Sequence, residues 1–246
     1  LAALLAGLWF GQPLRGEEQA TNETAPPDDG SAEFDDFEEY NGGGQHPGFD
    51  PLGGYNRIVF NVNDKLYFWV LKPVAQGYGF IVPEPVRVAV GKCSRNLMFP
   101  RNAVNNLLQA KWRNAGVETG RFCVNSTIGI LGLFDPAGNR LGWEPHPEDF
   151  GQTLGAHGVG AGVPIVWPLL GPSNLRDTLG LVPDYFLDPV SYLDSAGVRL
   201  AVHAGQRTNM ISLRIGEYED FKAAAYDPYV MMRDAYGQNR NREIEE

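Results

Sequence analysis

The hydrophobic and polar positions between residues 55 and 72 repeat with a helical period. Arg57, Asn61 and Asp64 are spaced i, i+4 and i+7, which places them on one face of a helix. Most of the other positions carry large apolar side chains. The pattern predicts a helix with a wide apolar surface and a narrow polar stripe, ended by Pro73. An ordinary surface helix has the opposite ratio.

The same pattern indicates further helices later in the chain. Residues 101–114 have the spacing of a second amphipathic helix, and residues 200–225 and 228–242 are expected to be helical too, the last of them polar. Between residues 117 and 194 glycine and proline interrupt the pattern, and there is no sustained alternation of the kind that marks β-strands. We therefore expect a mostly α-helical protein.

One stretch, residues 150–175, contains no Asp, Glu, Lys or Arg. Its length would suit a membrane span, but Pro164, Pro168 and Pro172 each remove a backbone donor and disturb a helix. Bent backbone at membrane depth survives only where protein or water satisfies its polar groups. The stretch is thus either the centre of a soluble core or part of a membrane-embedded ring, and composition alone favours the soluble core.

The amino-terminal part differs in composition from the rest. Residues 1–16 begin with an apolar run that resembles the end of a secretory signal peptide. Residues 17–48 are rich in acidic residues, glycine and proline, as in a disordered linker. We expect one folded domain over residues 49–246, ending in the polar helix.

The formal net charge of −10 belongs mainly to this linker, which carries ten acidic residues and no Lys or Arg between Glu17 and Glu39. From Asn41 onward the chain has 20 acidic and 19 basic residues, so the body is nearly neutral. Nucleic-acid binding needs a clustered basic surface. We therefore expect no nucleic-acid partner.

Signatures of catalysis and of metal or cofactor binding are absent from the sequence. It contains no GxSxG, HExxH or P-loop motif. The four histidines, at positions 46, 146, 157 and 203, do not have metal-ligand spacing. We expect neither an enzyme nor a bound metal or cofactor.

The two cysteines, Cys93 and Cys123, lack the CxxC spacing of redox and metal sites. In an oxidising compartment they could form a disulfide, which would stabilise the fold by about 3–4 kcal/mol. The alternative is two separate buried thiols. The disulfide is favoured if the chain is exported.

A series of short motifs resembles the MlaA (VacJ) family. Residues 50–61 (DPLGGYNRIVFN) are similar to the family's opening pattern DPLxGxNRxxFxxN, and residues 121–129 (RFCVNSTIG) to its RFxxNSTxG. Further matches follow in the family's order: residues 73–75, 83–87, 96–100, 105–109, 132–135, 148–155, 158–160, 168–177 and 227–240. The resemblance extends from about residue 49 to residue 242.

This resemblance implies a ring of kinked amphipathic helices that lies in the periplasmic leaflet of the outer membrane around a central amphipathic channel. It implies a non-catalytic role in phospholipid transport, in which phospholipid misplaced in the outer leaflet passes through the channel to a periplasmic carrier protein. This role maintains the lipid asymmetry of the membrane. A trimeric outer-membrane porin is the expected partner.

The sequence departs from the family in one respect. Family members usually carry a lipobox cysteine after the signal peptide, whereas no cysteine precedes Cys93 here. Either the native amino terminus differs from the given one, or attachment relies on insertion and on partners. The alternative function is that of a soluble periplasmic scaffold or lipid-binding module, with the apolar stretches as its core.

Several polar residues in apolar surroundings are candidates for the site. Buried groups of this kind usually form hydrogen bonds that fix a fold, and lining of the channel is the second interpretation. The candidates are Asn56, Arg57, Asn61, Asp64, Arg121, Asn125, Arg176 and Asp177.

Overall fold

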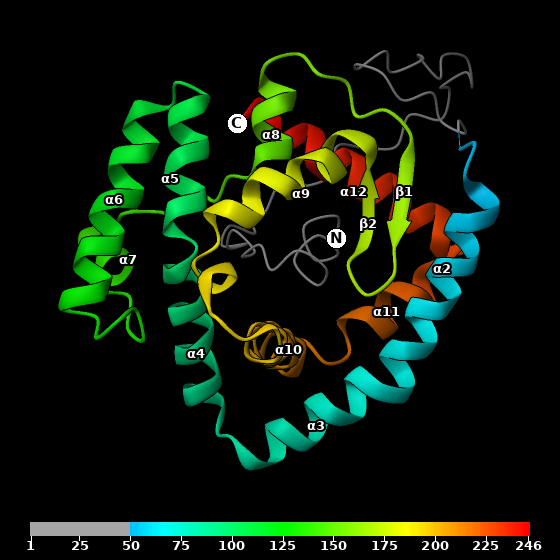
Figure 1. The fold of residues 1–246 in the computed structure, drawn as a ribbon. Helices are drawn as coiled ribbons and strands as arrows, with labels where there is room; N and C mark the ends of the chain where they lie inside the picture. Colours follow the sequence, from blue (N-terminus) through cyan, green and yellow to red (C-terminus); the bar gives the residue numbers. More distant parts are fainter. Residues whose placement is uncertain (1–49) are drawn as a thin grey trace, which may run out of the picture.

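Helices form most of the computed structural model, which describes residues 50–246 (Figure 1). In chain order the elements are α2 (Gly53–Leu66), the π-helical segment η1 (Tyr67–Leu71), α3 (Lys72–Ile81), α4 (Glu84–Leu97), α5 (Phe99–Leu108), α6 (Trp112–Thr127), α7 (Pro136–Leu141), α8 (Phe150–Ala156), β1 (Pro164–Trp167), β2 (Gly171–Asn174), α9 (Leu175–Leu187), the 3-10 helix η2 (Pro189–Tyr192), α10 (Ala196–Ser212), α11 (Glu217–Ala224) and α12 (Pro228–Glu245). The mostly helical fold class is confirmed. The expected signal remnant and acidic linker lie outside the described residues.

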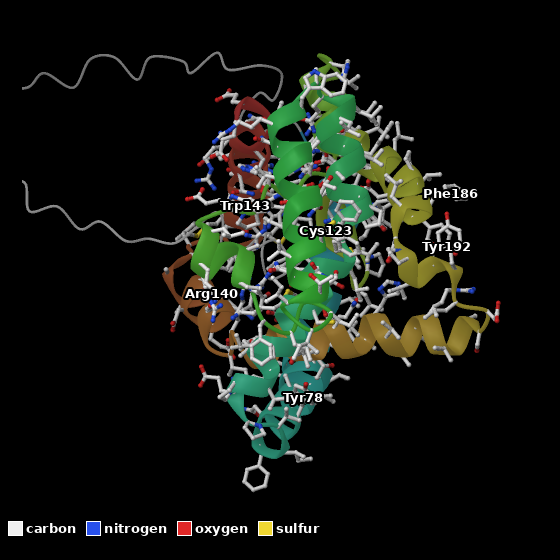
Figure 2. The ribbon with its side chains drawn as sticks, turned by 90° about the vertical axis from the view of Figure 1, so that its left-hand side faces the viewer. Tyr78, Cys123, Arg140, Trp143, Phe186 and Tyr192 are labelled. Carbon is white, nitrogen blue, oxygen red and sulfur yellow. The ribbon has the colours of Figure 1, made fainter. Side chains whose placement is uncertain are left out.

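The ribbon follows an annular path. In Figure 1, α2 and α3 form one side and the base, α4 and α5 form the opposite side, and α8, α9, α12 and the two strands close the top. Helices α6 and α7 lie outside α5, and α10 packs against α3 and α4. The turned view in Figure 2 shows α10 lying across the other elements and projecting to one side.

Pro73 does not end the first helix, contrary to the prediction. The chain passes from α2 through η1 into α3, and Pro73 lies in the first turn of α3. A proline clashes with the carbonyl four residues before it. In η1 the N–H of Lys72 donates to the carbonyl of Tyr67, five residues back, and this wider turn accommodates the proline. The helix therefore bends instead of breaking.

Two of the expected helices are each divided in two. Residues 101–114 belong to α5 and α6, which are separated at Ala110 with a φ of 58°. Residues 200–225 belong to α10 and α11, which are separated at Gly216 with a φ of 106°. A left-handed residue cannot continue a right-handed helix. Helix α12 agrees with the expected polar helix at the carboxyl end.

The charge-free stretch forms α8 and then an antiparallel hairpin that the sequence did not predict. Its strands pair from Pro164 opposite Asn174 to Trp167 opposite Gly171. Each strand has four residues, which is too short to give a recognisable alternation. Prolines are compatible with such strands because a two-stranded sheet has only edge positions.

The largest apolar cluster lies where α2, η1, β1, α11 and α12 meet. Its aromatic centre includes Tyr67 and Tyr218, with ring centroids 4.7 Å apart, and Phe60 and Tyr229, with ring centroids 6.0 Å apart. Residues from the two ends of the described chain thus close the annular path by packing together.

Candidate functional site

The distribution of polar and apolar side chains is inverted relative to a water-soluble protein. Among residues 50–246, eighteen polar or charged residues are buried, against fifteen apolar ones. Large apolar side chains lie outside: Phe80, Ile81 and Trp69 are 93%, 78% and 75% exposed. Figure 2 shows Phe186 and Tyr192 on the outside of the protein as well.

Water penalises large exposed apolar patches, whereas in hydrocarbon the polar groups must find partners within the protein. The inverted distribution therefore fits a protein whose outer faces contact lipid. None of the helices in the described range is both long and apolar enough to traverse a bilayer.

Asn56, on α2, is fully buried and contacts the backbone of β1. Its amide nitrogen donates to the carbonyl of Pro164 (3.0 Å), and its amide oxygen accepts from the N–H of Val166 (2.8 Å). Asn63, two turns further along α2, repeats this contact by donating to the carbonyl of Trp167 (2.9 Å). Asn63 was not among the predicted site residues, although its spacing of seven residues from Asn56 places both on one face.

The predicted polar stripe of α2 does not form a continuous inner lining. Arg57 is half exposed and forms an ion pair with Asp227 (2.8 Å), just before α12. Asp64 accepts from the ammonium group of Lys222 on α11 (2.8 Å). Asn61 is exposed. Arg57 and Asp64 therefore fasten the end of the chain to its first helix.

Arg176 and Asp177 belong to a buried charged network between α8, α9 and α12. Arg240 donates from Nε to Asp177 (2.9 Å) and from another nitrogen to Asp149 (2.7 Å). Arg176 donates to Asp177 (2.9 Å), and so does the hydroxyl of Tyr236 (2.6 Å). The network joins three helices that come from distant parts of the sequence.

The electrostatics of this network favour the charged forms of its members. Burial raises the pKa of Asp177, but the adjacent charges and hydrogen bonds of Arg240 and Arg176 outweigh burial and lower that pKa to about 2. For Arg240, burial lowers the pKa, and Asp149 and Asp177 outweigh it in the opposite direction. The network is a structural set of ion pairs, because each charge has its counter-charge.

Arg121 and Asn125 meet at Asp135, the residue that caps α7. Arg121 donates to Asp135 (3.0 Å), and so does the amide of Asn125 (2.9 Å), whose oxygen accepts from the N–H of Ala137 (3.1 Å). Arg121 also donates to the carbonyl of Trp143. These contacts hold α7 and the following loop against α6.

The expected disulfide is not present. Cys93 and Cys123 lie on different helices, α4 and α6, and both are free thiols. Cys123 is exposed on the outer helix, where Figure 2 labels it. The two thiols are separate, but neither is buried, so the alternative of two buried thiols does not describe them either.

Asp184, on α9, is a partly buried acid that the sequence analysis missed. It accepts from the amide of Asn105 (3.2 Å) and from the N–H of Phe150 (3.1 Å). Burial raises its pKa to about 6, and the negative charge of Asp149 adds to this rise. The available signal was that Asp184 is the only charged residue between positions 178 and 187.

The acidic, histidine and cysteine side chains do not gather into a metal site. Within residues 50–246 there is no group of three or more that could hold a metal ion. The polar residues of the interior instead bind one another and the backbone. Together with the exposed apolar side chains, they define a helical protein with an annular chain path, a polar interior and apolar outer faces.

Comparison with known proteins specifies this class. The family model described as MlaA lipoprotein matches residues 48–243, and the chain belongs to this family. The Escherichia coli protein named intermembrane phospholipid transport system lipoprotein MlaA is 32% identical over 198 residues, covering 78% of this chain and 77% of that protein. A Rickettsia felis protein is 34% identical over 217 residues, covering 85% of each chain.

A solved structure also matches the fold. It was described under the heading "Structural basis for maintenance of bacterial outer membrane lipid asymmetry". The match has a TM-score of 0.66 and 31% sequence identity, and it covers 79% of this chain and 98% of the other. The resemblance recognised in the sequence motifs is thereby confirmed.

Proposed function

We propose that the chain is a non-catalytic component of a phospholipid-transport system of the outer membrane. In this proposal it removes phospholipid misplaced in the outer leaflet and passes it to a periplasmic carrier protein, which maintains lipid asymmetry. The family, the name of the Escherichia coli relative and the description of the matching structure support the general role.

The inverted polarity around an annular path is the observation that carries the proposal. A phospholipid has a charged headgroup and two apolar chains, so its route needs polar groups inside a wall that hydrocarbon tolerates. The chain supplies the outer wall with exposed apolar faces, as on α2, where Ile58 is 66% exposed while the polar Asn56 is turned inward and bonded to β1. We propose that the protein lies in the periplasmic leaflet and that the lipid route passes through the middle of the annulus.

The proposed partners follow from this placement. The outer apolar faces would contact acyl chains and the wall of a trimeric porin, and the periplasmic side would deliver lipid to the carrier. Cross-linking in intact cells, with a photoreactive residue in place of the exposed Leu200 (71% exposed) or, as the control, Gln238, tests the porin contact. We expect the porin to be captured from position 200 and not from the polar helix α12.

The role itself is tested by complementation of a bacterial strain that lacks its own family member. We expect the chain to lower the amount of phospholipid in the outer leaflet to the level of the parent strain, measured by labelling of surface-exposed phosphatidylethanolamine. A chain that reaches the outer membrane without restoring asymmetry would contradict the proposal. A purified chain that stays monodisperse without detergent would instead support a soluble scaffold or lipid-binding module.

A further inference from the structure

A cationic pocket lies between α4, α5 and α6, on the side of the annulus where α6 and α7 are found. Its charged lining consists of the cations Lys92, Arg95, Arg101 and Arg121 and the acids Glu118 and Asp135. Four positive and two negative side chains give the pocket a net positive charge. In a body that is close to neutral, this is a local concentration of cations.

Both acids are already engaged in contacts within the protein. Glu118 accepts from the amide of Asn102 (3.1 Å) and from the N–H of His146 (2.7 Å). Asp135 accepts from Arg121 (3.0 Å) and from the N–H of Gly138 (2.9 Å). Arg121 is therefore the one cation of the pocket with a carboxylate partner.

The other three cations have no carboxylate bonded to them within residues 50–246, although Asp135 acts electrostatically on Arg95, and Arg101 acts on Asp149 and Asp184. Lys92, Arg95 and Arg101 form no ion pair and no side-chain hydrogen bond with any residue in the 50–246 range. The Nε of Arg101 and the amide oxygen of Asn102 are buried without a hydrogen-bond partner. Buried polar atoms normally have partners, so Arg101 leaves one donor and Asn102 leaves one acceptor unused beside the pocket.

The pKa of Arg95 reflects the closeness of other positive charges. Desolvation lowers the pKa of Arg95, and the positive charges of Arg121 and Arg214 lower it further, against the opposing effect of Asp135. A bound anion would relieve this repulsion. Two arginines and a lysine that line one pocket offer donors suited to the oxygens of a phosphate, with which arginine forms paired hydrogen bonds.

The remaining lining of the pocket combines three asparagines, Asn96, Asn102 and Asn125, with an apolar wall. The rings of Phe99 and Phe122 are stacked with centroids 4.4 Å apart, and Met98, Pro145 and Pro147 complete the wall. This wall suits the glycerol and first methylene groups of a lipid, which a free phosphate lacks.

We propose that this pocket binds the phosphate group of a phospholipid, an inference that rests on the proposed transport function. The pocket would hold the headgroup beside the annulus, between α4 and the α5–α6 pair. A lipid headgroup and free phosphate present the same phosphate oxygens to the pocket. The experiment therefore tests a phospholipid and inorganic phosphate separately.

The experiment compares the purified full chain in non-ionic detergent with two triple variants. The test variant is Lys92→Gln/Arg95→Gln/Arg101→Gln. The matched control, Lys65→Gln/Arg113→Gln/Arg140→Gln, removes the same charge from exposed positions outside the pocket; Figure 2 labels Arg140. The probes are dihexanoyl phosphatidylglycerol, inorganic phosphate and dihexanoylglycerol, followed by isothermal titration calorimetry.

We expect the test variant to bind phosphatidylglycerol at least about tenfold more weakly than the native chain, because it loses charge-assisted hydrogen bonds. The control variant should differ less than about twofold, and added salt should weaken native binding because it screens the charges. Dihexanoylglycerol should bind equally to all three proteins. If the test variant loses its circular dichroism signal, Arg101→Gln and Arg101→Lys replace it, and we expect the lysine to retain binding.

Unchanged phosphatidylglycerol binding in the folded test variant would overturn the proposal. Tight binding of inorganic phosphate without binding of the lipid would overturn the lipid assignment. The calorimetric titration tests the pocket, whereas the amount of outer-leaflet phospholipid in cells tests the transport role. Failure of one is therefore distinguishable from failure of the other.

Discussion

At the scale of single residues, an asparagine side chain makes the hydrogen bonds to a strand that the backbone of a neighbouring strand makes in most sheets. One amide group carries a donor and an acceptor, so it can pair with an N–H and a carbonyl of an adjacent strand. Asn56 uses both for β1. Hydrogen-bonded networks around such residues could be expected from the sequence, but their partners could not, since Asn56 and Val166 lie 110 positions apart.

Replacing Asn56 tests this role. Asn56→Ala leaves the buried N–H of Val166 and the carbonyl of Pro164 without partners, so we expect the free energy of unfolding to fall by about 2–3 kcal/mol. The matched control is Asn61→Ala, an exposed position on the same helix, which should change it by less than about 0.5 kcal/mol. Urea unfolding in detergent, followed by tryptophan fluorescence, measures both. Equal losses of unfolding free energy in the two variants would show that the contact of Asn56 with β1 does not stabilise the fold.

Asp184 predicts a pH dependence of stability. Its pKa is raised from the ordinary value of 3.8 to about 6 in the folded protein. The folded state thus binds the proton more tightly than the unfolded state, and native stability falls as the pH rises through this interval. At about 1.4 kcal/mol per pKa unit, the loss is about 2–3 kcal/mol.

The variant Asp184→Asn cannot ionise, so it should gain stability relative to the native chain as the pH rises from 4 to 8. The measurement is the difference in unfolding free energy between the two proteins at each pH. A difference that does not change with pH would show that the carboxyl group of Asp184 titrates normally.

At the scale of elements, helices α8 and α9 approach each other closely because glycines face each other. A Cβ on Gly180 would lie 2.6 Å from the backbone nitrogen of Gly151. A Cβ on Gly151 would in turn lie 2.4 Å from a carboxylate oxygen of Asp177. The charged network therefore depends on a crossing that has no room for a methyl group.

The variant Gly180→Ala should consequently lower the unfolding free energy by about 1–3 kcal/mol, since overpacking forces the backbones apart. The control is Gly116→Ala in α6, where an added Cβ meets nothing within 4 Å. That change should leave stability equal or raise it by up to about 1 kcal/mol, because alanine favours helix. Thermal unfolding by circular dichroism distinguishes the two outcomes.

Sequence periodicity located the helices better than their limits. The apolar repeat continues through Ala110 and Gly216, so it cannot reveal that each lies in a left-handed turn. Pro73 shows the opposite error. A proline usually ends a helix, but here the π-helical segment η1 accommodates it and the chain stays helical. Such features depend on local backbone geometry and on packing between distant segments, which a linear pattern does not contain.

At the scale of the whole molecule, apolar residues cover the outside. The sequence signalled this in the broad apolar surface of the first helix, but composition alone favoured a soluble core for residues 150–175. The burial of its side chains shows which side of α2 faces inward. Asn56 and Asn63 point toward the hairpin, and Val62 lies outside with 45% of its surface exposed. The cationic pocket was not predicted, because its residues come from three helices.

Charging one outer face tests its contact with lipid. Leu179, Val182 and Phe186 lie on one face of α9 and are 59%, 62% and 62% exposed. Replacing all three by Asp should move the protein out of the membrane fraction without unfolding it, because a charge in hydrocarbon costs about 2.5–3.5 kcal/mol. Cell fractionation gives the distribution, and circular dichroism reports folding.

The matched control places Asp at Gln238 and Asn241, exposed positions on the polar helix α12. We expect this variant to stay in the membrane fraction. Release of both variants to the same extent would mean that added negative charge, and not the α9 face, determines attachment.

The hairpin has a consequence for self-association. A bare strand edge invites a strand from a neighbouring molecule, and within a lipid leaflet no water competes for it. The side-chain amides of Asn56 and Asn63 on α2 bind that edge of β1, so a strand of another copy cannot pair with it. While these contacts hold, two copies cannot pair edge to edge through β1.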